Sequence, residues 1–409
     1  MKIYLIIITI LTFNYTTFAD FIALNKEVDN LANLTQSPVT RDIEGEPLKI
    51  LPGDLKTAFY DALPYEGKPT RVFCWIGLPK NASEQSKVPG IVLVHGGGGT
   101  AFKTWVQKWN EKGFAAISIA VEGQIDDRPE KSNKQKGIFW KEHNWPGPRR
   151  SGIYHDSEKP LKDQWMYHAV ADTILANSLL RSIPQIDDKK IGVMGISWGG
   201  VITSTVIGID SRFAFAVPTY GCGALSTAAN QYGRSLGNND MYKKVWDPIL
   251  RLKNVKFPVL WLSWPGDKHF PMDSLSECYK APQSERMVSL IPGMKHGHPA
   301  GWSPPDSYAF AQSVIASGKP WCIQKNISYQ ENIFKVTFTS TSTMQKATLI
   351  WSSDSGVTGN RKWEKVEAKL AGNSGEWTVE SEIPEKATAW FVNVNSGKLT
   401  VSSDYYQKK

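Results

Sequence analysis

The sequence predicts an α/β protein, in which a mostly parallel sheet is covered by helices on both faces, followed by a small all-β domain. Three observations lead to this prediction. Short, continuously apolar runs such as 90–94 and 190–195 alternate with helical patterns, which is typical of parallel strands that are buried on both faces. From about residue 325 the pattern changes to alternating strands separated by tight turns. The 409 residues are also enough for a large core and a second unit.

Residues 1–19 have the pattern of a secretory signal peptide. Lys2 precedes a short apolar run, and the small residues Thr17 and Ala19 stand at positions −3 and −1 of a cleavage site after Ala19. An uncleaved anchor is the alternative, although the run is shorter than the ~20 residues of a membrane-spanning helix. No later stretch is long and apolar enough to span a bilayer. We therefore expect a secreted or periplasmic protein without a membrane partner after cleavage.

The remaining chain divides into three predicted parts. Residues 20–65 are polar and mixed, and we expect them to form a peripheral segment. Residues 66–322 hold the alternating strands and helices of the main domain, and residues 323–409 are predicted to form an antiparallel β-sandwich. The predicted elements of the main domain are strands at 71–78, 90–94, 114–120, 190–195, 213–219, 258–263 and 287–291, a helix over 163–182 and another from 199.

Two long segments interrupt the alternation of strands and helices. Residues 121–162 and 222–255 both stand where a strand should lead into a helix, at the carboxyl edge where open α/β sheets bind ligands. Loops of that length are usually functional lids or disordered insertions.

Composition narrows the classes of function. The balance of 41% hydrophobic and 21% charged residues is typical of a folded protein, and the net charge of +8 is not gathered into a basic block. We therefore expect no nucleic-acid partner. The four cysteines lack CxxC spacing, which speaks against a metal site, and export would permit three different disulfide pairings.

The strongest chemical motif is Gly195-Ile196-Ser197-Trp198-Gly199, between an apolar strand and a helix. A serine on such a sharp turn needs glycine on both sides, and it is exposed at the edge of the sheet as a nucleophile. The amide of Trp198 then points toward a developing oxyanion. The motif predicts Ser197 as the nucleophile.

A glycine tract follows the strand 91–94 and begins after His95. Glycines let backbone amides approach a ligand without interference from side chains, so we expect Gly97 or Gly98 to supply the second oxyanion donor. His95 itself is expected to be structural.

A nucleophilic serine needs a base, and the base needs an orienting carboxylate. Asp267, in a turn just after the strand 258–263, is the predicted acid, with Asp273 as the second choice. His296 follows the last strand and is the predicted base, with His298 as its alternative.

These motifs together resemble the α/β hydrolases of the dienelactone hydrolase, acetylxylan esterase and prolyl-oligopeptidase kind. The resemblance rests on His95 with its glycines, "IGVMGISWGG", "GDKHFPMDS" and "KHGHPAGW", and covers about residues 65–320. It implies the α/β-hydrolase fold and hydrolysis through an acyl-serine intermediate without a cofactor. Dienelactone hydrolases proper have a cysteine as nucleophile, whereas position 197 is serine, which favours ester or peptide hydrolysis over the lactone reaction. The C-terminal segment is similar to a small β-sandwich that is appended to some exported bacterial esterases.

The insertion 121–162 supplies the clues to substrate. Trp140 and Trp145 could stack on sugar rings, Arg149 and Arg150 could bind a carboxylate or sulfate, and His269 could line the pocket. We therefore predict an exported esterase that removes acyl groups, such as acetyl, from a small-molecule or polysaccharide ester. A peptidase or amidase, and a non-catalytic binding protein with the same fold, are the alternatives.

Overall fold

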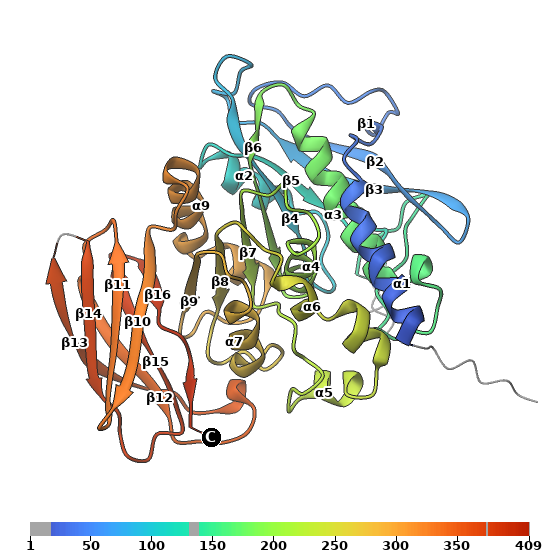
Figure 1. Cartoon of the computed structure of the whole chain (residues 1–409). Coiled ribbons are helices and arrows are strands. Elements are labelled where there is room, and N and C mark those ends of the chain that lie inside the picture. Colours follow the sequence, from blue (N-terminus) through green and yellow to red (C-terminus); the bar gives the residue numbers. More distant parts are fainter. Residues whose placement is uncertain (1–17, 131–138, 374, 409) are drawn as a thin grey trace, which may run out of the picture.

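The computed structural model describes residues 18–130, 139–373 and 375–408, which form two sheets side by side (Figure 1). The first sheet has nine strands in the order β1-β2-β3-β5-β4-β6-β7-β8-β9. Its strands are β1 (Thr40–Arg41), β2 (Leu55–Tyr65), β3 (Lys68–Gly77), β4 (Val88–Val94), β5 (Ala115–Ile119), β6 (Ile186–Ile196), β7 (Phe215–Thr219), β8 (Val259–Ser263) and β9 (Arg286–Leu290). The six strands from β5 to β9 pair in parallel, and the first three in the order pair antiparallel.

Helices cover both faces of this sheet because its central strands are apolar on both sides. Along β4, Val92 and Val94 pack into the core beneath α3, α4 and α7, whereas Ile91 and Leu93 pack on the opposite side, beneath α2 and α9. The helices are α1 (Phe18–Asp29), α2 (Lys103–Asn110), α3 (Trp165–Arg181), α4 (Trp198–Val206), α5 (Gln231–Leu236), α6 (Ile249–Leu252), α7 (Met272–Lys280), α8 (His298–Trp302) and α9 (Pro305–Ser317). Shorter helical turns are η1 (Asn30–Asn33), η3 (Leu161–Asp163), η4 (Tyr242–Trp246) and η5 (Thr358–Asn360).

The N-terminal segment corrects one prediction. Residues 20–65 were expected to be peripheral, but Leu55–Tyr65 is a full strand of the main sheet, paired along its length with β3. Its polar residues are explained by its position near the edge of the sheet, where one face meets solvent. The predicted signal peptide lies almost entirely outside the described residues. In the described part of the chain, no helix has both the length and the apolar character needed to cross a membrane.

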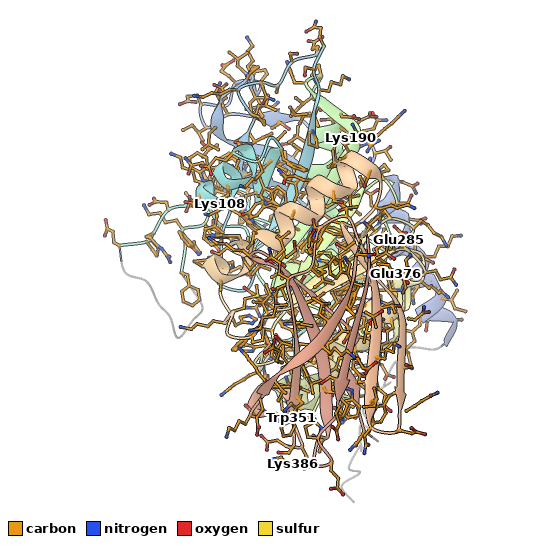
Figure 2. All side chains as sticks on the ribbon, turned by 90° about the vertical axis from the view of Figure 1, so that its left-hand side faces the viewer. Lys108, Lys190, Glu285, Trp351, Glu376 and Lys386 are labelled. Carbon is orange, nitrogen blue, oxygen red and sulfur yellow. The ribbon has the colours of Figure 1, made fainter. Side chains whose placement is uncertain are left out.

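The C-terminal strands form one antiparallel sheet that bends into a half-barrel. The strands are β10 (Cys322–Gln330), β11 (Ile333–Ser340), β12 (Lys346–Ser352), β13 (Glu364–Asn373), β14 (Glu376–Glu382), β15 (Ala389–Ser396), β16 (Leu399–Ser402) and β17 (Tyr406–Gln407). The bend lies in β13, whose first half pairs with β12 and whose second half pairs with β14. The predicted all-β unit is therefore present as a single bent sheet, and its concave side buries large side chains such as Phe338 and Trp390. Figure 2 views it from the side, with Glu376 and Trp351 toward opposite ends.

The half-barrel covers the open edge of the main sheet at β9. Leu290 donates its amide to Ser402 Oγ at 2.8 Å, and its carbonyl accepts from Asn393 Nδ2 at 2.9 Å. Since an uncovered edge strand would expose unpaired backbone groups, these side chains close the sheet.

Asp172 on α3 offers a test of the core. Its side chain is buried, Oδ1 has no hydrogen-bond partner among the described residues, and burial raises the pKa of the carboxyl well above its usual value. A carboxyl group whose pKa is higher in the folded than in the unfolded state contributes to the stability of the fold at a pH below its unfolded pKa. This contribution is lost as the pH rises through the folded pKa. We expect Asp172→Asn to raise the free energy of unfolding at pH 8 relative to its effect near pH 4, because asparagine has no charge to bury.

Thermal or urea unfolding from pH 4 to pH 8 measures this difference. Asp61→Asn, at an exposed position of β2, is the control and should leave the pH dependence unchanged. An Asp172→Asn variant whose stability follows the wild-type curve at every pH would contradict the burial of this charge.

Candidate active site

Ser197 lies on a strained turn between β6 and α4. Its backbone has φ +58° and ψ −118°, a conformation that side-chain-bearing residues rarely adopt. Both neighbouring glycines are required by close packing. A methyl group at Gly195 would stand 1.9 Å from the carbonyl oxygen of Gly199, and one at Gly199 would stand 2.0 Å from that of Val94. The turn can therefore form only with glycine at both positions, as the motif predicts.

The three residues predicted as a triad form one hydrogen-bonded chain. His296 Nε2 lies 2.9 Å from Ser197 Oγ, and His296 Nδ1 lies 2.8 Å from Asp267 Oδ2. They come from the ends of β6, β8 and β9, which meet at the carboxyl edge of the sheet. In this order the Nδ1–H donates to the carboxylate, and Nε2 is left to accept the serine proton. Asp273, the second choice for the acid, lies in the first turn of α7.

The carboxylate of Asp267 is fixed by four donors. Oδ1 accepts from the amides of His269 and Phe270 at 2.8 and 2.9 Å, and Oδ2 accepts from Trp264 Nε1 at 3.2 Å besides His296. The side chain is buried, and this many donors hold the carboxylate in one orientation.

Tyr220 holds the loop that carries the histidine. Its hydroxyl donates to the carbonyl of Gly297 at 2.5 Å and accepts from the amide of the same residue at 3.3 Å. Its ring lies 4.4 Å from that of His296. Nothing in the sequence marks Tyr220 for this role, since a tyrosine directly after a buried strand is typical of a core residue.

His298 contacts the glycine tract instead of the serine. Its Nε2 accepts from the amide of Gly96 at 2.9 Å, and a methyl group at Gly99 would stand 2.6 Å from it. Burial lowers the pKa of His298 to about 4, so the ring is neutral at physiological pH, as an acceptor nitrogen requires. The geometry thus favours His296 over His298 as the base.

Three backbone amides at the site have no acceptor. In the described residues, the N–H groups of Gly97, Gly98 and Trp198 donate no hydrogen bond, whereas the amide of Gly96 is engaged by His298. Amides without an acceptor, one from the residue after the serine and two from the glycine tract, are the kind of donors that bind an oxyanion.

The insertion 121–162 stabilises the glycine tract through hydrogen bonds to its carbonyls. Trp140 Nε1 donates to the carbonyl of Gly98 at 3.0 Å, and Gln124 Nε2 donates to that of Gly99 at 2.8 Å. His95 is fully buried, donating from Nδ1 to the carbonyl of Gly96 at 2.7 Å and accepting the amide of Val121 at 3.1 Å. Burial lowers its pKa to about 3, so its position and charge state are those of a structural residue.

Two of the predicted substrate-binding residues lie beside the site. The guanidinium of Arg150 is 4.9 Å from the ring centroid of Trp198, and a methyl group at Gly97 would stand 2.8 Å from its Nη2. Its Nε is 3.4 Å from Glu122. The ring of His269 lies 4.8 Å from that of His296. Both are therefore placed where a substrate bound at the serine could touch them.

The other predicted substrate-binding residues have different partners. Trp140 supports the glycine tract, as described above. Trp145 is half exposed and stacks with Arg71, whose guanidinium lies 5.1 Å from its ring centroid. Arg149 pairs with Glu142 at 2.5 Å. Neither Trp145 nor Arg149 contacts the triad or the glycine tract in the described structure, so their predicted role in binding gains no support.

The described residues contain no group of three or more His, Cys, Asp or Glu side chains that could hold a metal ion. All four cysteines are buried and carry free thiols, so none of the three possible pairings is formed.

The chain is similar to several known hydrolases. The family model of acetyl xylan esterase (AXE1) matches residues 47–224. The chain is 25% identical over 252 residues to the uncharacterized peptidase YuxL of Bacillus subtilis (strain 168), and this match covers 55% of the chain but 34% of that protein. The chain thus spans only about a third of the length of this curated relative.

Two solved structures share the fold. Acetyl xylan esterase 1 from Thermoanaerobacterium sp. JW/SL YS485 is 16% identical with a TM-score of 0.51, over 68% of this chain and 89% of that chain. The acetyl xylan esterase from Paenibacillus sp. R4 is 20% identical with a TM-score of 0.51, over 70% of this chain and 92% of that chain. These similarities and the strand–turn–helix around Ser197 show that the chain has the α/β-hydrolase fold, and its residues 47–224 resemble acetyl xylan esterases.

Proposed function

We propose that this protein is a serine hydrolase of carboxylic esters that works through an acyl-serine intermediate. The observation that carries the proposal is the hydrogen-bonded chain Ser197–His296–Asp267 beside the free amides of Gly97, Gly98 and Trp198. A nucleophile, a base with an oriented tautomer and donors for an oxyanion are the parts that acyl transfer requires.

The mechanism follows from these positions. His296 Nε2 takes the proton of Ser197 as Oγ attacks the ester carbonyl, and the free amides bind the oxygen that becomes negative. When this tetrahedral intermediate collapses, His296 gives its proton to the leaving alcohol and the acyl group stays on the serine. Water then attacks the acyl-serine with His296 again as base, and the acid is released. Asp267 stabilises the imidazolium in both halves.

We further propose that the acyl group is a short one, such as acetyl, and that it is carried by a carbohydrate. This part is supported by the match of residues 47–224 to the acetyl xylan esterase model and by Arg150, whose guanidinium lies over the ring of Trp198 beside the site. Export through the pattern in residues 1–19 would bring the enzyme to such a polymer. Peptide hydrolysis is the second candidate, since the chain shares 25% identity with a peptidase of B. subtilis over 252 residues.

A panel of substrates separates these functions. Purified protein is given p-nitrophenyl acetate, acetylated xylan, deacetylated xylan and peptidyl p-nitroanilides, and the release of acetate or chromophore is measured. We expect hydrolysis of the aryl ester and release of acetate from acetylated xylan, with at least about 100-fold lower kcat/KM on the anilides, the range in which substrate-specific contacts discriminate. Faster cleavage of the anilides would support the peptidase, and no ester hydrolysis would contradict the proposal.

A further inference from the structure

The loop between β12 and β13 of the half-barrel reaches back to the turn that carries Asp267. It forms the helical turn η5, which contacts α7 at the N-terminal end of that helix (Figure 1). Thr358 in this turn is buried, and its Oγ1 accepts the amide of Met272 at 2.8 Å. Met272 is the first residue of α7, so this bond caps the helix that follows the acid turn.

Gly359 packs directly on the backbone of the acid. A methyl group built there would stand 2.0 Å from the carbonyl oxygen of Asp267 and 2.6 Å from the amide nitrogen of Lys268. Its φ is not in the left-handed region, so backbone conformation does not require glycine at this position. The close approach to Asp267 is what requires it.

The loop is held firmly enough to act as a support. Trp363 Nε1 donates to the carbonyl of Thr358 at 3.1 Å, and the Trp363 ring lies beside Phe391 and Tyr405 of the half-barrel, with centroids 5.8 and 6.4 Å away. Arg361 donates to the carbonyl of Gly356 from Nε at 3.0 Å and from Nη2 at 2.7 Å. The turn η5 is thus fixed at both of its ends.

The turn that carries Asp267, residues 267–272, is also held by the main domain. Asn230, at the start of α5, donates from Nδ2 to the carbonyls of Lys268 and His269 at 2.9 and 2.8 Å. The turn 267–272 is therefore contacted by Asn230 of the main domain as well as by Thr358 and Gly359 of the half-barrel.

We infer that Thr358 and Gly359 of the half-barrel are positioning residues, which set the place of the Asp267 carboxylate against His296. This inference rests on the proposed function for its effect on catalysis. Because misplacing a catalytic group by about 1 Å can cost about 100-fold in rate, a support that contacts the acid backbone is enough to control turnover. The half-barrel then completes the active site of the main domain without touching substrate.

Two substitutions test the inference in the full chain. Thr358→Val keeps the shape but removes the acceptor, and Gly359→Ala displaces the acid turn. We expect kcat on p-nitrophenyl acetate to fall about 10-fold and about 100-fold, respectively, with KM nearly unchanged, because the substrate does not contact these residues. Thr358→Ser retains the hydroxyl and should rescue the rate. Thr378→Val is the matched control, since its side chain on β14 makes no hydrogen bond in the described structure and lies on the half-barrel.

A second measurement is independent of turnover. The proton shared by His296 Nδ1 and Asp267 is recorded as a low-field resonance in protein with ¹⁵N-labelled histidine. The resonance should shift or vanish in Thr358→Val and Gly359→Ala while Thr358→Ser and Thr378→Val keep it. Thermal unfolding shows whether Gly359→Ala is folded. If it is not folded, the comparison of Thr358→Val with Thr358→Ser tests the positioning role by itself.

The outcomes separate two failures. If the wild type hydrolyses no ester, the proposed function fails, but the resonance still reports on the acid. If the resonance is the same in the folded variants as in the wild type, the positioning role is overturned, whatever happens to the rate. Absence of the resonance from the wild type would overturn it as well, because the acid–base pair would not be formed.

Discussion

Replacing Ser197 by alanine is expected to lower kcat on p-nitrophenyl acetate by about 10⁶-fold, the loss that follows removal of a triad nucleophile. The reason is that Oγ is the atom that forms the acyl bond, and His296 Nε2 lies 2.9 Å from it with no other described acceptor or donor. The free amides would remain and would leave a residual acceleration over water. Steady-state kinetics of the purified variant measure the change.

Ser263→Ala is the control for this substitution. Ser263 is also buried at the end of a strand of the same sheet, but its hydroxyl has no hydrogen-bond partner among the described residues. Its removal should leave kcat within about twofold, as expected for a side chain that makes no polar contact. Equal activity of Ser197→Ala and the wild type would mean that another residue is the nucleophile.

Replacing Asp267 by asparagine is expected to lower kcat by about 10⁴-fold, as the loss of the orienting carboxylate does in serine proteases. Oδ1 accepts two backbone amides, so the side-chain oxygen of asparagine would occupy that place and its NH₂ would face His296. His296 Nδ1 would then have to accept, which moves the ring proton to Nε2. A protonated Nε2 cannot take the proton of Ser197.

Asp273→Asn separates the two candidate acids. This residue lies in the first turn of α7, where its charge interacts with the helix N-terminus, a contribution of about 0.3–1 kcal/mol to stability. The kcat of the Asp273→Asn variant should equal that of the wild type, measured on the same ester at the same pH. A large loss at Asp273 together with a small one at Asp267 would reverse the assignment.

The sequence predicts the centre of this fold well because its signals there are local. Continuous apolar runs identify the parallel strands. Glycine is needed at positions 195 and 199, since any side chain there would clash with neighbouring backbone. The positions of Asp267 and His296 follow from the order of strands, since the carboxyl ends of parallel strands meet at one edge.

The parts that were missed depend on contacts between distant segments. β2 lies near the edge of the sheet and mixes Lys56, Thr57 and Asp61 with apolar residues, so it lacks the continuous apolar run that identifies the central strands. Tyr220, Asn230 and Thr358 act through one or two hydrogen bonds each to loops 38 to 86 residues away, and no local pattern marks such bonds. The half-barrel differs from the predicted sandwich through one long strand, β13, that pairs on both sides of a bend.

Ser197 is the residue that becomes acylated in the proposed mechanism, and covalent trapping tests this directly. The wild type and Ser197→Ala are treated with a fluorophosphonate, which phosphonylates activated serines, and the adduct is located by peptide mass spectrometry. We expect one adduct, on Ser197, with loss of ester hydrolysis in proportion to labelling, and no adduct in the variant. Labelling of another residue that tracks the loss of activity, or full inactivity toward the probe in a protein that hydrolyses esters, would contradict the account.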